Sequence, residues 1–164
     1  MKGAVIFRSR YGVTRQYATW IAEDTGFDLK DIDKDSIDLS LYDRVIIGAS
    51  IRAGKFINSG WIHKHRDELQ SKDLIIFSVG GYPPSAEDKI EKAKKNSIPE
   101  GLNYRYFALQ GKISMDMLKW WERAAFCIIS KLDKKNDEIG NIVKGFDFVK
   151  RENIKPVVES ALSE

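Results

Sequence analysis

Apolar runs alternate with amphipathic segments along the chain, which is the pattern of an α/β protein. Asp43–Ala49 and Asp73–Val79 are continuous apolar runs, typical of strands that are buried on both faces of a parallel sheet. Further strands are predicted at 3–8, 27–32 and 103–109. Apolar residues at helical spacing predict helices at 14–25, 59–70, 83–95, 114–132 and 150–163.

The chain has 164 residues, which is enough for one domain with a sizeable core. No linker divides it, so residues 1–164 are expected to form a single domain, with 131–145 as a surface loop. The sequence shows no signal peptide and no apolar run long enough to span a bilayer. The sole cysteine, Cys127, excludes an internal disulfide and indicates an intracellular protein. Its apolar neighbours predict a buried thiol.

The segment Ser9–Thr14 lies between the first strand and the first helix, where a phosphate can be held. The N–H groups of a first helical turn point out of the helix end, and the helix dipole favours an anion there. Gly12 permits a positive φ, while Ser9 and Thr14 offer hydroxyl groups that could bind the anion or cap the helix. An ordinary capped turn explains the same residues equally well. The dinucleotide and P-loop fingerprints are absent, and this short hydroxyl-bearing loop fits a terminal monophosphate better than a pyrophosphate.

Two further loops follow predicted strands and also begin with serine, Ser50–Ser59 and Ser78–Ser85. In doubly wound sheets, ligands bind outside the carboxyl ends of the strands. The first of these loops is small, flexible and cationic, and the second places Gly80-Gly81 beside Tyr82. One loop for a phosphate and two for a flat ring would make a mononucleotide site. The alternatives are a plain turn at Gly80-Gly81 and an exposed loop tip at Tyr82.

The formal net charge of +3 favours an anionic partner only weakly. Residues 112–135 contain six Lys or Arg and three Asp or Glu, so this segment alone also carries +3. Its predicted helix has two adjacent apolar stripes, formed by Leu118, Trp121, Ala125, Ile128 and Leu132 and by Met117, Trp120, Ala124 and Cys127. Paired tryptophans beside lysines suit a membrane interface or a hydrophobic partner. A core helix that also covers a neighbouring helix is the simpler interpretation.

These features together resemble the flavodoxin family, which binds flavin mononucleotide (FMN). Ser9–Thr14 is similar to the family's T/S-x-T-G-x-T phosphate loop, with Tyr11 in place of the middle threonine. A closer similarity is to the branch that contains the bacterial menaquinone-dependent protoporphyrinogen oxidases. The segments that carry it are Tyr42–Arg52 followed by Gly54, His65–Leu69, Phe77–Val79, and Phe107–Lys112 leading into the basic aromatic segment. The resemblance extends over nearly the whole chain. It implies a flavodoxin-like, doubly wound, five-stranded parallel sheet with helices on both faces, in three α/β/α layers.

Carried over by position, the family's flavin contacts fall on the three loops. The residues implied to bind FMN are Ser9, Arg10, Tyr11, Gly12, Val13 and Thr14 around the phosphate, Ser50, Ile51, Arg52, Ala53 and Gly54 on one side of the isoalloxazine ring, and Ser78, Val79, Gly80, Gly81 and Tyr82 on the other. Of these, Tyr82 is placed to stack on the ring. The other side offers Ile51 or Arg52, which leaves that face open to a substrate or a quinone. We assign no catalytic residue and no metal site.

The resemblance therefore implies an FMN-dependent oxidoreductase of the protoporphyrinogen oxidase-like kind, acting in heme biosynthesis and exchanging electrons with a partner protein or a quinone. The alternative is a flavodoxin-type electron carrier without substrate chemistry of its own. Such carriers are usually strongly acidic, whereas this chain is basic. A flavin-free domain that binds nucleic acid ranks last, because the charges are mostly dispersed. The expected location is the cytoplasm, with peripheral contact at the inner face of the cell membrane through residues 114–132. No oligomeric state is predicted.

Overall fold

The computed structural model describes residues 1–81, 86–132 and 145–163, and a parallel sheet lies at its centre. The sheet has five parallel strands, as the sequence analysis expects, and their order is β2-β1-β3-β5-β6. Their bounds are β1 (Gly3–Phe7), β2 (Asp28–Asp31), β3 (Arg44–Arg52), β5 (Asp73–Gly80) and β6 (Arg105–Gln110). A short strand, β4 (Lys55–Phe56), pairs antiparallel with the end of β3. The order reverses between β1 and β3, which is where such sheets bind ligands.

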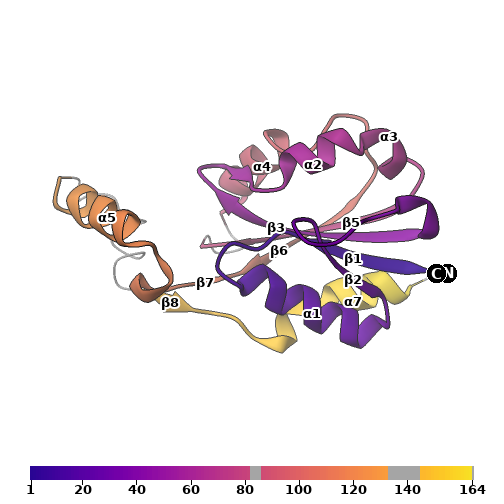
Figure 1. Ribbon diagram of the computed structural model, residues 1–164, viewed down its shortest axis with the longest axis horizontal. Coiled ribbons are helices and arrows are strands. Elements are labelled where there is room, and N and C mark those ends of the chain that lie inside the picture. Colours follow the sequence, from indigo (N-terminus) through magenta and orange to yellow (C-terminus); the bar gives the residue numbers. More distant parts are fainter. Residues whose placement is uncertain (82–85, 133–144, 164) are drawn as a thin grey trace.

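Helices cover both faces of the sheet and complete the three layers (Figure 1). One face carries α1 (Val13–Thr25) and α7 (Lys155–Leu162), and the other carries α2 (Ser59–Lys64), α3 (Arg66–Leu69) and α4 (Glu87–Lys95). Successive residues of the central strands supply the two separate cores, because side chains alternate across a strand. Ile46 of β3 packs with Tyr17 and Val157, whereas Ile47 belongs to the core on the opposite face.

Two predicted helices are shorter than the sequence pattern suggests, and a third begins outside the described residues. The helix expected over 59–70 is interrupted at His65, which ends α2 and precedes α3. The terminal helix begins with a 3₁₀ turn, η3 (Arg151–Ile154), because Pro156 fits the first turn of α7 rather than a helix interior. The third predicted helix, over 83–95, is described from Glu87. A further 3₁₀ turn, η1 (Leu39–Leu41), precedes β3.

The helix expected over 114–132 begins instead at Trp120, as α5 (Trp120–Leu132). Before it come β7 (Lys112–Ile113) and the 3₁₀ turn η2 (Met115–Met117), and Leu118 is extended and buried. β7 pairs antiparallel with β8 (Phe146–Asp147), a short ribbon that the sequence did not predict. The ribbon carries α5 away from the sheet (Figure 1). Most of the predicted surface loop 131–145 lies outside the described residues.

Because α5 projects from the sheet, the expectation that it is a core helix is wrong. Trp120 is 81% exposed, Trp121 47% and Ile128 59%. Cys127, predicted to be a buried thiol, is exposed for the same reason. None of the helices in the described part of the chain has the length and the apolar character needed to cross a membrane.

Candidate functional site

The segment after β1 turns tightly into α1. Ser9 Oγ accepts a hydrogen bond from the Gly12 N–H (3.1 Å), and Gly12 takes φ +86° as the N-cap residue of α1. The first helical hydrogen bond runs from the Gln16 N–H to the Gly12 carbonyl (2.9 Å). The N–H groups of residues 13–15 therefore precede the hydrogen-bonded part of the helix. The first turn of α1 has no acidic residue, so this turn presents donors and a positive dipole end to an anion.

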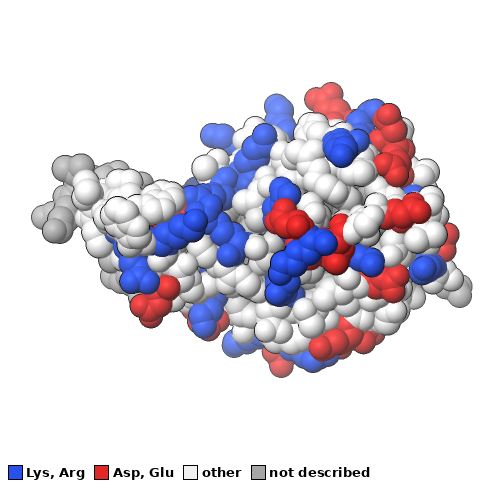
Figure 2. Space-filling model, viewed as in Figure 1, with Lys and Arg blue, Asp and Glu red and all other residues white. Residues whose placement is uncertain are grey.

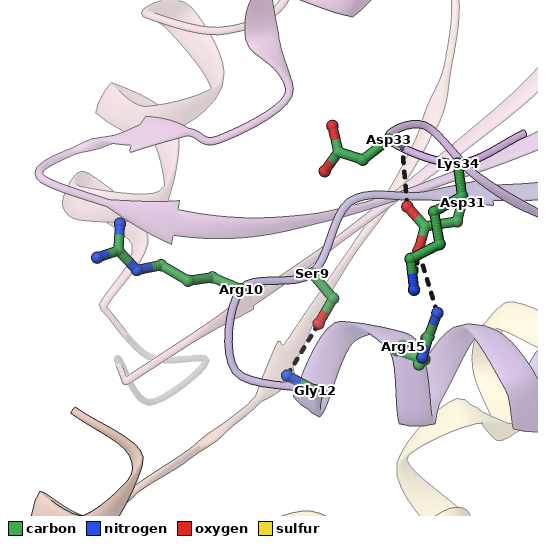
Figure 3. Close-up of a pocket in the computed structure, with 7 residues that line it drawn as sticks. All are labelled: Ser9, Arg10, Gly12, Arg15, Asp31, Asp33 and Lys34. Carbon is green, nitrogen blue, oxygen red and sulfur yellow. Dashed lines mark hydrogen bonds and ion pairs between the residues drawn. The ribbon is translucent and has the colours of Figure 1, made fainter. Parts of the chain in front are cut away.

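A cavity of about 250 Å³ lies beside this turn (Figure 3). The residues that line it are Ser9, Arg10, Gly12, Arg15, Asp31, Asp33 and Lys34. Both of its carboxylates are paired with cations. Arg15 Nη2 lies 3.1 Å from Asp31 Oδ2, and Arg8 binds Asp33 through Nε and Nη2, at 2.9 and 2.6 Å from Oδ1. Three cations, Arg8, Arg15 and Lys34, lie within ion-pair distance of these two carboxylates and leave the cavity net positive. Ligand pockets usually enclose about 300–1,000 Å³, so this cavity suits one end of a mononucleotide rather than the whole molecule.

The second predicted loop begins with a β-hairpin. Arg52 pairs with Lys55 across a two-residue turn, in which Ala53 and Gly54 have φ +48° and +70°. Two positive φ values are the mark of the tight turn that matches the twist of paired strands. Asn96 Nδ2 donates to the Gly54 carbonyl (3.0 Å) and ties the tip of the hairpin to the end of α4. Ser50 and Ile51 lie in β3 and are half-buried.

The third predicted segment is mostly strand. Ser78, Val79 and Gly80 belong to β5; the Ser78 hydroxyl contacts the Tyr106 hydroxyl (2.5 Å) and Val79 is buried, so neither side chain is free to line an open site. The Gly80 carbonyl accepts from the Gly111 N–H (2.9 Å), and Gly80 is the last residue of β5. Gly81 is exposed. Tyr82, predicted to stack on the ring, lies outside the described residues.

One carboxylate, Glu122 of α5, joins the first loop to the hairpin. Its Oε1 lies 2.7 Å from Arg10 Nη2, 2.9 Å from Arg52 Nη2 and 3.0 Å from the Tyr11 hydroxyl. Its Oε2 accepts from the Lys119 N–H (3.0 Å), as a glutamate in the third position of a helix commonly does. Glu122 is only 3% exposed. Burial, and then the hydrogen bond to Glu122, raise the pKa of Tyr11 above its usual value, so its hydroxyl remains a donor at neutral pH.

The structure thus brings Ser9–Thr14 and the Arg52 hairpin together, and it adds residues that the sequence analysis missed. Figure 2 shows Lys and Arg side chains gathered between the projecting α5 and the rest of the molecule. Asp31, Asp33 and Lys34 were overlooked because they lie at or just after the end of β2, a short strand that gave no ligand signal. Glu122 has a local signal, an acidic residue in a first helical turn. Its contacts to Arg10 and Arg52, however, span 112 and 70 residues and have no local pattern.

Comparison with known proteins places the chain among proteins of this fold. The family described as "Flavodoxin domain" matches residues 4–139. A curated relative, "Protoporphyrinogen IX dehydrogenase [quinone]" of Escherichia coli strain K12, is 24% identical over 145 residues, 80% of each chain. A solved protein from Bacteroides eggerthii is similar with a TM-score of 0.52 at 19% identity, over 79% of this chain and 98% of that one. A flavoprotein from Lactobacillus acidophilus, solved in complex with FMN, has a TM-score of 0.50 at 13% identity, over 66% and 91%.

Proposed function

The chain belongs to the flavodoxin domain family, and on that premise we propose that it is an FMN-binding oxidoreductase that takes electrons from a porphyrinogen-like substrate and passes them to a quinone. The observation that carries the cofactor assignment is the start of α1. Gly12 holds φ +86° with open space beside its Cα, and the donors of residues 13–15 follow it. A phosphate bound there meets backbone N–H groups and the positive end of a helix dipole.

The residues present fit FMN in chemistry as well as in position. The cavity beside the turn has a net positive lining, which suits a phosphate dianion. The hairpin turn Ala53-Gly54 follows β3, and the exposed Gly81 follows β5; the carboxyl ends of these neighbouring strands share one edge of the sheet. These two ends border the place for a flat ring. When bound, FMN would supply the electron transfer, while the protein would orient it and exclude competing reactions. The stacking role of Tyr82 remains a prediction.

The substrate and the acceptor are proposed from the curated relative. Its name gives protoporphyrinogen IX as the donor and a quinone as the acceptor. The basic region between α5 and the sheet favours an anionic substrate, because opposite charges attract across a binding surface. With this substrate and this acceptor, the protein would act in heme biosynthesis.

We also propose that α5 contacts an anionic membrane surface, where a lipid-soluble quinone would be available. Trp120, Trp121 and Ile128 are exposed apolar side chains on a helix that stands away from the core. Lys119 and Arg123, also exposed, supply positive charge beside them. Aromatic residues next to cations are what interfacial helices present to headgroups and acyl chains.

The central experiment is reconstitution with FMN followed by anaerobic assay with protoporphyrinogen IX and menadione. We expect the protein to bind FMN and to form porphyrin only when both FMN and the quinone are present. Each step of the reaction removes an electron pair and protons from the porphyrinogen and reduces a quinone to a quinol. Apoprotein without FMN is the control. Bound FMN without porphyrin formation would refute the substrate assignment and favour a one-electron carrier, and failure to bind FMN would refute the whole proposal.

A further inference from the structure

Arg10, Tyr11 and Arg52 converge on a single carboxylate, and we call these three residues the carboxylate cluster. Two of them lie on the first loop and one on the hairpin, so the cluster sits where the two segments proposed to hold FMN approach each other. In this structure the carboxylate is that of Glu122, whose side chain is 4% exposed. The cluster therefore already has the chemistry of a carboxylate-binding site: two guanidiniums and one hydroxyl.

The helix that brings Glu122 to the cluster is not fixed there by a packed core. α5 projects from the sheet, and its large side chains Trp120, Trp121 and Ile128 face solvent. Arg123, next to Glu122, donates only to the nearby carbonyls of Leu118 and Asp116 in the contacts described for it. Glu122 is thus a polar contact between α5 and the two loops, and an exchange of its carboxylate would leave the hydrogen bonds of the sheet in place.

The cluster has capacity beyond what Glu122 uses. The contacts described for Arg10 and Arg52 reach Glu122 through one nitrogen each, Nη2, whereas a guanidinium can bind a carboxylate through two. The side chains of Arg10 and Arg52 are 33% and 42% exposed, so both are open to a molecule arriving from solvent. Two cations share one anion, which leaves a net positive charge at this point.

We infer that the carboxylate cluster is a substrate subsite, which binds a carboxylate group of the redox substrate and which Glu122 fills when substrate is absent. The inference rests on the proposed function, and it narrows the substrate class to carboxylate-bearing molecules. Protoporphyrinogen IX meets this requirement, because its ring carries two propionate side chains. Entry of a substrate carboxylate displaces Glu122, and with it the amino-terminal turn of α5.

The test compares a porphyrin diacid with its neutral ester on the FMN-loaded protein. Binding of protoporphyrin IX and of its dimethyl ester is measured by fluorescence titration in non-ionic detergent micelles. Wild-type protein should bind the diacid about tenfold more tightly than the ester, roughly the worth of one charge-assisted hydrogen bond. Glu122→Gln keeps the size of the side chain and removes the competing charge, so it should tighten diacid binding severalfold and leave ester binding unchanged. Arg52→Gln should abolish the preference for the diacid.

The matched control is Asp116→Asn, which removes a carboxylate of the same segment that takes no part in the cluster. It should leave both affinities as in wild type, and circular dichroism confirms folding of each variant. Equal binding of diacid and ester, no binding of either, or no effect of Glu122→Gln on their ratio would overturn the subsite. If Glu122→Gln instead strengthens FMN binding as much as diacid binding, the cluster serves the cofactor phosphate and the inference is wrong. Equal binding of the two porphyrins, or an unchanged ratio in Glu122→Gln, leaves the proposed function standing. Absence of binding to either porphyrin also counts against the porphyrinogen-like substrate, and failure of the wild-type protein to bind FMN removes both proposals.

Discussion

At the scale of single residues, α1 offers an internal comparison between its two ends. Gly12 at its start has φ +86°, and Gly26 at its end has φ +73°. Neither would place a Cβ within 4 Å of another group, so an alanine at either position meets backbone strain without a clash. Gly26 donates its N–H to the Ala22 carbonyl (2.8 Å) and closes the helix, as glycine commonly does. Replacing glycine with alanine therefore introduces similar backbone strain at both ends of α1. Only the substitution at Gly12 also affects the proposed phosphate site.

Gly12→Ala is expected to weaken FMN binding about tenfold or more, because about 1–2 kcal/mol of left-handed strain is relieved by moving the loop and its N–H donors. Gly26→Ala should lower the free energy of unfolding by a similar amount and leave the FMN dissociation constant unchanged. Quenching of flavin fluorescence gives the affinity, and urea denaturation of the apoprotein gives the stability. Equal FMN affinity in the two variants would contradict the assignment of the phosphate site.

At the scale of elements, α5 has the apolar pattern of a core helix but does not pack on the core. Its apolar residues recur at helical spacing, and that pattern usually marks the face of a helix that packs on a core. Here the β7–β8 ribbon carries the helix outward, and the extended, buried Leu118 interrupts the stripe before α5 begins. The apolar face is consequently left for contacts outside the sheet, and Lys119 and Arg123 lie beside it.

The double substitution Trp120→Ser and Trp121→Ser should reduce binding to phosphatidylcholine vesicles containing phosphatidylserine by about tenfold or more, because it removes two exposed indole side chains from α5. Co-sedimentation measures the bound fraction, with and without phosphatidylserine. Leu162→Ser, which changes an exposed apolar residue of α7 near the opposite end of the molecule, is the control and should bind as wild type. If the bound fraction of wild-type protein does not change when phosphatidylserine is added to the vesicles, the result argues against a membrane role.

At the scale of the whole molecule, the sheet could be predicted from sequence because its signals are local. β3 and β5 are apolar on both faces. A single glycine between a strand and a helix, Gly12, is enough to predict the turn there. Element ends were predicted less well where a neighbour decides them. The interruption at His65 and the β7–β8 ribbon depend on contacts that adjacent residues do not reveal.

The candidate site likewise has parts that the sequence could predict and parts that it could not. The position of Ser9–Thr14 follows from its place between β1 and α1, so sequence alone could locate it. The hairpin form of the second loop depends on pairing of Ile51 with Phe56 and on the anchor from Asn96. Glu122 could not be assigned, because its partners come from distant parts of the chain and no spacing relates them.

The edge of the sheet opposite the site is held by a second set of ion pairs. Asp73, the first residue of β5, lies between Arg44 of β3 (2.5 Å) and Arg105 of β6 (2.6 Å). Arg44 also donates to the carbonyls of Ala161 and Ser163, and Arg105 to that of Ser160, so both join the sheet to the end of α7. Cations at the carboxyl end of a helix also favour its dipole. The ion pairs of Asp73 with Arg44 and Arg105 therefore belong to a network that connects the C-terminal helix to three strands.

The ionisation of Asp73 should make the stability of this arrangement depend on pH. Burial alone would raise the pKa of Asp73, but the hydrogen bonds from Arg105 and Arg44 lower it below its ordinary value. A carboxyl group with a lowered folded-state pKa stabilises the fold above its unfolded pKa of about 4, and that contribution is lost as the pH falls through the folded-state value.

Asp73→Asn should therefore be less stable than wild type at pH 7, and its free energy of unfolding should fall less steeply below about pH 4. Urea denaturation across that range measures both effects, with Asp67→Asn, at a side chain that is 93% exposed, as the control. If Asp73→Asn and wild type lose stability in parallel as the solution is acidified, the ion pairs at this edge do not hold α7 in the way the geometry indicates.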